Sequence, residues 1–312
     1  MGSVAVTGSV AYDTIMVFPG RFADHILSDQ VHSLNVSFLV ERLERRRGGT
    51  AANIAYTLAL LGERPLLCAA VGHDFAEYGA ALSAAGVDTS GTLLCDDVST
   101  ATAFITTDAD DNQITAFFPG AMARAVGVDL TMLSDIDHVV VAPDAPDAMR
   151  AHTEQAASLG ARLVFAPAQQ LSSMSDETLN AGLDAAWMVV GNDYELEVIL
   201  RRTGRNAGSL AAEGAMVALT RGAEGSELHA DGVVHRIPAA APERLVDPTG
   251  AGDAYIAGLL TGLRAGRAPE VAARMGALAA TYVIEQQGPQ SHGYGREDFA
   301  ARYARAFGEP LD

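Results

Sequence analysis

The stretch Asp247-Pro-Thr-Gly-Ala-Gly-Asp253 runs directly into a helix-like segment at residues 254–265. Gly250 and Gly252 allow a tight turn that brings backbone N–H groups close to a ligand. The helix adds the positive end of its dipole, so the segment predicts an anion-binding site. A carboxylate beside an anion is useful when it takes a proton from a hydroxyl group during phosphate transfer, which is the role we expect for Asp253. The segment therefore suggests a kinase that acts on a small alcohol.

A purely structural explanation of the same segment stays open at this point. An aspartate in the first turn stabilises a helix without any ligand, and glycine-rich turns between strand and helix occur in many α/β proteins. The glycine spacing matches neither the P-loop nor the dinucleotide-binding fingerprint. Other parts of the chain have to decide between the two explanations.

Composition restricts the possible partners of this 312-residue chain. Hydrophobic residues make up 49% and charged residues 19%, which is typical of a globular protein. A formal net charge of −18 argues against a nucleic-acid or anionic-membrane partner, because either would require a basic face. The N-terminus has no signal-peptide pattern, and with only Cys68 and Cys95 we expect a cytoplasmic protein with reduced cysteines.

The chain alternates between apolar runs and helical patterns. Continuous apolar runs are typical of strands that are buried on both faces of a parallel sheet. We expect such strands at residues 4–8, 65–71, 139–142, 163–166, 188–190 and 216–219, and helices at 50–61, 75–85, 254–265, 269–285 and 297–306.

Two β-rich insertions interrupt this regular pattern. Residues 102–107 and 113–118 flank the turn signal 108–112 and predict a hairpin. With the insertion at about 12–46, the one at about 98–120 would form a small β-sheet lid that excludes water from phosphate transfer. We therefore expect one α/β domain over residues 1–312, with a doubly wound, mostly parallel sheet flanked by helices. A second hairpin is expected at residues 227–237.

Two polar motifs follow an expected strand or open an expected helix. Asp13 could accept hydrogen bonds from two adjacent hydroxyl groups, or it could belong to a polar turn. Gly48 and Gly49 allow close backbone approach to a ligand, and Asn53 could bond a hydroxyl; a simple helix entry explains them equally well. The intervening run 44–47, Glu-Arg-Arg-Arg, is expected to be a solvated charge run.

Two further motifs suggest a nucleotide site. Asn192 and Glu195 match a capping box at a helix start, and the same residues could bind Mg²⁺ through water. Thr220, Gly222 and Gly225 follow an apolar strand and could present N–H groups to nucleotide phosphates, although the pattern alone is weak.

These motifs occur in one order along most of the chain. They read G-S-x-x-x-D at 8–13, G-G-x-x-x-N at 48–53, N-x-x-E at 192–195, T-x-G-x-x-G at 220–225 and D-P-T-G-A-G-D at 247–253. The ordered set resembles the ribokinase-like (PfkB) family of carbohydrate and nucleoside kinases. The resemblance implies a doubly wound core with a β lid, ATP as phosphate donor and dependence on Mg²⁺.

Within that family, further segments resemble bacterial adenosine kinases of the actinobacterial type. These segments are residues 18–22, 37–40, 118–122, 169–171 and 192–195. On this resemblance, the base of adenosine would stack on two lid phenylalanines near a glutamine. The implied acceptor-binding residues are Ser9, Asp13, Gly48, Gly49, Asn53, Phe104, Phe118 and Gln170; Asn192, Thr220, Gly222 and Gly225 would bind ATP.

The expected reaction is ATP-dependent phosphorylation of the adenosine 5′-hydroxyl to give AMP. Asp253 would be the general base, and the N–H groups of Gly250, Ala251 and Gly252 would form the anion hole, while Glu195 would hold Mg²⁺ through water. By resemblance we also expect a homodimer formed through the lid. A sugar kinase for ribose or fructose, and a catalytically silent binding protein on the same fold, stay open as alternatives.

Overall fold

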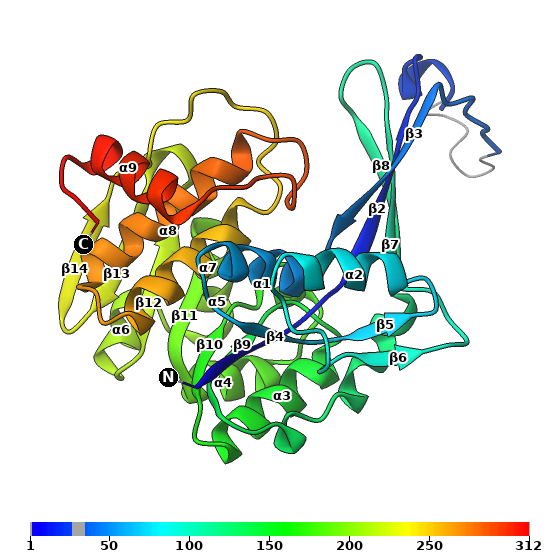
Figure 1. The fold of residues 1–312 in the computed structure, drawn as a ribbon. Coiled ribbons are helices and arrows are strands. Elements are labelled where there is room, and N and C mark those ends of the chain that lie inside the picture. Colours follow the sequence, from blue (N-terminus) through cyan, green and yellow to red (C-terminus); the bar gives the residue numbers. More distant parts are fainter. Residues whose placement is uncertain (1, 27–34, 312) are drawn as a thin grey trace.

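The computed structural model describes residues 2–26 and 35–311, and an eight-stranded sheet runs through its centre (Figure 1). The strand order is β14-β13-β12-β11-β10-β9-β1-β4, and the strands from β4 to β12 are parallel, while β13 and β14 form an antiparallel edge. The expected mostly parallel sheet is confirmed. Its strands are β1 (Ser3–Thr7), β4 (Pro65–Cys68), β9 (Ile136–Val141), β10 (Arg162–Phe165), β11 (Ala186–Asn192), β12 (Met216–Thr220), β13 (Ser226–Ala230) and β14 (Val233–Ile237).

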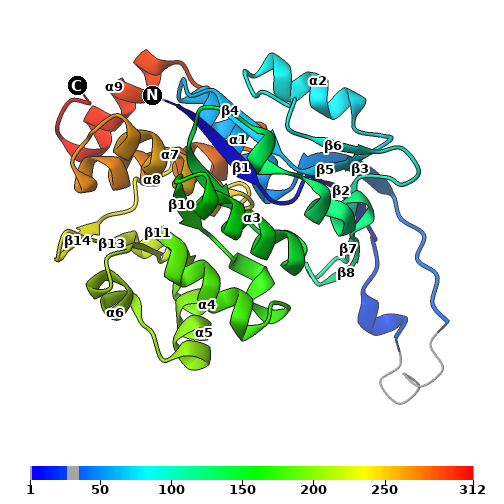
Figure 2. The same ribbon diagram turned by 90° about the horizontal axis from the view of Figure 1, so that it is seen from below.

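Helices cover both faces of this sheet (Figures 1 and 2). Val4 and Val6 of β1 pack into one core layer, whereas Ala5 packs into the opposite layer, because strand side chains alternate between faces. The first layer contains α1 (Thr50–Leu60), α2 (Ala76–Ala84), α7 (Ala251–Arg264) and α8 (Pro269–Ile284), and α9 (Arg296–Phe307) packs outside α8. The second layer contains α3 (Pro146–Ser158), α4 (Asp176–Ala185), α5 (Asp193–Thr203) and α6 (Ala207–Ala212). None of these described helices is both long and apolar enough to cross a bilayer.

A second sheet of four strands stands out from the core at one end of the molecule (Figure 1). We call it the lid. Its order is β3-β2-β7-β8, and the expected pair at 102–107 and 113–118 is confirmed as β7 and β8. The lid strands are β2 (Ala11–Val17), β3 (Arg42–Gly48), β7 (Ala101–Thr107) and β8 (Gln113–Phe118). Residues 27–34 of the expected first insertion lie outside the described residues.

The structure corrects three local expectations. The single strand expected at 65–71 is wrong, because the chain leaves the main sheet after β4 and forms β5 (Ala70–Gly72), which pairs with β6 (Leu93–Cys95). Asp13 lies inside lid strand β2 and not in a turn. The run 44–47 is part of β3, where Arg45 and Arg47 are exposed as expected, but alternation leaves the side chain of Arg46 only 14% exposed.

Candidate active site

Two adjoining cavities open at the carboxyl ends of the parallel strands, which is the usual ligand position in open α/β sheets. The first, of about 340 Å³, lies between the lid and the core, and we call it the acceptor cavity. The second, of about 240 Å³, lies over β11 and β12, and we call it the donor cavity. Asp253 and Gly250 line both cavities, so a molecule in either one would meet the start of α7.

The acceptor cavity brings together residues that lie far apart in the sequence. Among the residues expected there, Ser9, Asp13, Gly49, Asn53 and Gln170 line it. Gly48 lies just behind this wall, where a Cβ atom would come within 2.8 Å of an Asp13 carboxylate oxygen. Gly49 has φ +94, and a Cβ atom there would stand 2.6 Å from the Ala11 nitrogen, so both glycines are required by close packing beside the cavity.

The register in which the lid strands pair decides which aromatic side chain faces the acceptor cavity. Asp13 pairs with Ala103, which pairs with Phe117, so these three side chains share the inner face of the lid. Phe104 and Phe118 lie on the outer face, and Phe117 lines the cavity. Phe104 and Phe118 therefore do not line the cavity as the resemblance implies, and Phe117 does, because neighbouring strand residues point to opposite faces.

Asn53 connects the acceptor cavity to the expected general base. Its Nδ2 donates to Asp253 Oδ2 at 2.8 Å, across 200 residues of sequence. Ser9 lines the acceptor cavity, and its Oγ also accepts a hydrogen bond from the Thr50 N–H at 3.0 Å at the start of α1. The Ser9 hydroxyl therefore stabilises the helix that carries Asn53.

The start of α7 has the geometry of an anion site. Gly250 is the N-cap with φ +83, and a Cβ atom there would lie 2.4 Å from Pro289 Cβ, so glycine is required. The N–H groups of Gly250 and Gly252 have no acceptor among the described residues, whereas the Ala251 N–H reaches the Pro248 carbonyl at 3.2 Å. Gly250 and Gly252 are therefore better placed than Ala251 to donate to an anion.

Asp253 has the electrostatics of a general base. Burial raises the pKa of its carboxyl to about 7, the negative charge of Glu195 adds to this rise, and the hydrogen bond from Asn53 opposes it. A pKa near neutrality lets the group both accept a proton and release it at physiological pH. Perturbed carboxylates of this kind occur preferentially at functional sites.

The donor cavity contains two of the four residues expected to bind ATP. Asn192 and Thr220 line it, together with Glu195. The expected capping box is confirmed: Asn192 Oδ1 accepts from the Glu195 N–H at 2.8 Å, and Glu195 Oε2 accepts from the Asn192 N–H at 2.9 Å. Gly222 and Gly225 do not line the cavity. Gly225 has φ +92 and lies against the Ile237 carbonyl, so the turn between β12 and β13 accounts for it.

The carboxylates fit a Mg²⁺ ion that is shared with phosphates. No group of three acidic, histidine or cysteine side chains that could hold a metal by itself occurs in residues 2–26 and 35–311. Mg²⁺ commonly takes one or two carboxylates together with water and substrate phosphates. Glu195 and Asp253 both line the donor cavity and could serve an ion of that kind.

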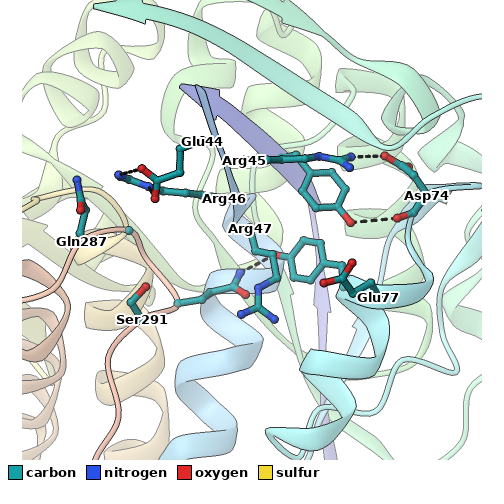
Figure 3. Close-up of a pocket in the computed structure, with 12 residues that line it drawn as sticks. Glu44, Arg45, Arg46, Arg47, Asp74, Glu77, Gln287 and Ser291 are labelled. Atoms are coloured by element: carbon teal, nitrogen blue, oxygen red, sulfur yellow. Dashed lines mark hydrogen bonds and ion pairs between the residues drawn. The ribbon is translucent and has the colours of Figure 1, made fainter. Parts of the chain in front are cut away.

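The sequence patterns give no role to Asp247, Arg46 or Gln290, all of which support the site. Asp247 accepts from the N–H groups of Thr249 and Gly288 at 2.9 and 3.0 Å, which fixes the turn before α7. Arg46 pairs with Glu44 and lies 3.7 Å from Asp247. It also lines a third cavity, of about 500 Å³, beside β3 (Figure 3). Asp247 belongs to the turn by sequence, whereas only the final fold brings Arg46 and Gln290 near it.

This arrangement supports the transfer of an anionic group to a hydroxyl. That chemistry places the protein among the kinases of small alcohols. A model of the pfkB family carbohydrate kinases matches residues 1–293, and the chain belongs to that family. It is an ATP-dependent phosphotransferase that acts on a hydroxyl group.

Similar proteins are known as sequences and as solved structures. A nucleoside kinase of Methanothermobacter thermautotrophicus is 33% identical over 86% of this chain and 88% of its own length. The Burkholderia thailandensis nucleoside kinase in complex with inosine is 36% identical, with a TM-score of 0.88 over 99% of both chains. The Methanocaldococcus jannaschii nucleoside kinase is 25% identical, with a TM-score of 0.86 over 98% of this chain and 99% of that one.

Proposed function

We propose that the protein is a nucleoside kinase that phosphorylates the 5′-hydroxyl of adenosine to give AMP. The observation that carries the proposal is the position of Asp253 on the wall common to the acceptor and donor cavities. A hydroxyl in the first cavity and a phosphate chain in the second would meet at this carboxylate. The names of the similar proteins support a nucleoside as the acceptor.

The proposed reaction uses few groups. Asp253 accepts the proton of the 5′-hydroxyl as its oxygen bonds to the γ-phosphorus of ATP, and the bond to the β-phosphate oxygen breaks to release ADP. The free N–H groups at Gly250 and Gly252 stabilise negative charge on the transferred phosphoryl group. Asp13 and Asn53 bind ribose hydroxyls. Glu195 would hold Mg²⁺ through water, and the bound ion would offset phosphate charge.

Contacts in the acceptor cavity support adenosine over a sugar. Phe117 and Met122 offer apolar surface to a flat base, and Gln170 adds an amide that can donate and accept hydrogen bonds. Ribose or fructose would leave this surface without a partner. The Burkholderia protein was solved in complex with inosine, so inosine is the alternative acceptor to compare with adenosine.

An acceptor panel tests the proposed substrate. With ATP as donor, we expect a higher kcat/KM for adenosine than for inosine, cytidine, ribose or fructose, measured as ADP release. The same panel with Asp253→Asn identifies background turnover from contaminating kinases. Preference for inosine would move the assignment to another purine nucleoside, and turnover of sugars alone would replace the nucleoside assignment. Absence of turnover with every acceptor would favour the silent binding protein.

We also propose that the protein forms a homodimer through the outer face of the lid. Lid register places Leu43, Phe104, Ile114 and Phe118 on this one face, and each side chain is between 42% and 64% exposed. An apolar face of this kind on an open sheet is typical of an interaction surface, and two copies related by a twofold axis would cover it. The cytoplasmic location stays a prediction.

Charged substitutions on the lid test the dimer. We expect wild-type protein to have the mass of a dimer by light scattering, and the double substitution Phe104→Asp with Ile114→Asp to have the mass of a monomer, because burying two carboxylates is costly. Met132→Asp, at an 80% exposed apolar residue outside the lid, is the matched control and should stay dimeric. A monomeric wild type would refute the proposal, as would a dimer that survives the double substitution.

A further inference from the structure

Gln290 connects two helices of the core, one of which carries Asn53 of the acceptor-cavity wall. It lies in the segment between α8 and α9, and its Nε2 is 2.9 Å from Asn53 Oδ1 and 2.5 Å from Tyr78 Oη. Nε2 of a glutamine has two hydrogens and no acceptor capacity, so both contacts are donations. One amide nitrogen therefore bonds α1 and α2 at the same time.

The Tyr78 hydroxyl has one possible orientation in this arrangement. It donates to the Gly48 carbonyl at 2.8 Å and accepts from Gln290. Burial raises the pKa of Tyr78, so the phenol keeps its proton over the whole working pH range. The hydrogen bonds consequently run in a fixed direction, with Gln290 donating to Tyr78 and Tyr78 donating to the carbonyl of Gly48 at the lid base.

The orientation of the Asn53 amide follows from the same bonds. Because Oδ1 accepts from Gln290, Nδ2 faces Asp253 and donates to its carboxylate at 2.8 Å. A reversed amide would place Oδ1 against Asp253 and its NH₂ group against the Gln290 NH₂ group, which are two unfavourable contacts. Asn53 is only 5% exposed, so solvent does not offer the reversed amide alternative partners.

We propose that Gln290 is a positioning residue for phosphoryl transfer, which holds the Asn53 amide so that Nδ2 is directed at Asp253. The inference rests on the proposed role of Asp253 as the general base. Gln290 does not line the acceptor cavity and is not expected to touch the nucleoside. It acts through Asn53, by keeping the carboxylate in the direction in which the acceptor hydroxyl arrives.

The first experiment replaces Gln290 with residues of similar length. We expect Gln290→Met to lower kcat about tenfold, the effect of losing one orienting hydrogen bond, with the KM for ATP unchanged. Gln290→Glu should lower kcat further, because its carboxylate faces Asn53 Oδ1 and favours the reversed amide. Gln287→Met is the control at an exposed glutamine three residues away and should retain wild-type kcat. Thermal melting shows that each variant is folded.

A double-mutant cycle distinguishes positioning from general support of the fold. If Gln290 acts through Asn53, Gln290→Met will have no further effect on kcat in an Asn53→Ala background. Multiplicative effects of the two substitutions would overturn the proposal, and so would wild-type kcat in folded Gln290→Met and Gln290→Glu. Failure of the base assignment would be seen separately, as near-normal turnover in Asp253→Asn with Gln290 intact.

Discussion

Asp253→Asn is expected to lower kcat by about 10² to 10⁴, the range that general base catalysis usually supplies, while the protein stays folded. The asparagine keeps the shape of the side chain, and its Oδ1 can still accept from Asn53, so only the proton acceptor is lost. Steady-state kinetics with ATP and adenosine measure the effect. Turnover within tenfold of the wild type would contradict the assignment of the base.

The raised pKa of the Asp253 carboxyl predicts that both activity and stability depend on pH. Because the pKa of Asp253 is raised to about 7, kcat/KM should increase with pH up to about 7 and then level off, and protonation should reduce it below that. The raised pKa also means that ionisation of Asp253 costs stability as the pH rises through 7. Asp253→Asn, which cannot ionise, should therefore melt no lower than the wild type at pH 8. Asp147→Asn, at an exposed carboxylate in the first turn of α3, is the control for both measurements.

Gly252→Ala is expected to lower activity while it raises the stability of the fold. A Cβ atom at Gly252 meets no atom within 4 Å, and the residue lines the donor cavity, so the methyl group would stand where a phosphate approaches the backbone N–H. We expect kcat/KM for ATP to fall about 10²-fold, as when one charge-stabilising donor is lost. Alanine is also favoured over glycine in a helix by about 0.5–1 kcal/mol, so the melting temperature should rise.

Gly208→Ala is a matched control for that substitution. Gly208 is exposed, occupies the second position of α6 as Gly252 does in α7, and lies in neither cavity. It should show a small change in stability and wild-type kinetics. If Gly252→Ala retained normal kcat/KM for ATP, the transferred phosphoryl group would have to bind away from the start of α7.

Much of the fold could be predicted because it depends on local patterns. Continuous apolar runs identify strands that are covered on both faces, and the helix expected at 254–265 forms, although it begins earlier, at Ala251 after the N-cap Gly250. The capping box at Asn192 is also local, since its two partners lie three residues apart. The split of residues 65–71 into two strands could not be predicted, because a continuous apolar run does not show where a strand leaves its sheet.

The lid shows a second limit of local patterns. Both Phe117 and Phe118 are aromatic residues in one strand, and only the register with β7 and β2 shows that Phe117 shares a face with Asp13. A shift of one residue would have exchanged the two faces. The resemblance to adenosine kinases favoured Phe118 for the cavity, and the pairing of the strands corrects it.

By itself the sequence determined the chemistry: a glycine turn, a helix start and Asp253 together predict phosphate transfer to a hydroxyl group. The tertiary structure alone decided how that carboxylate is held and what it faces. Asn53 bonds Asp253 across 200 residues, and Gln290 bonds Asn53 across 237. Spacing along a chain records which residues share a turn or a face, but hydrogen bonds between distant segments exist only after the sheet and helices have packed.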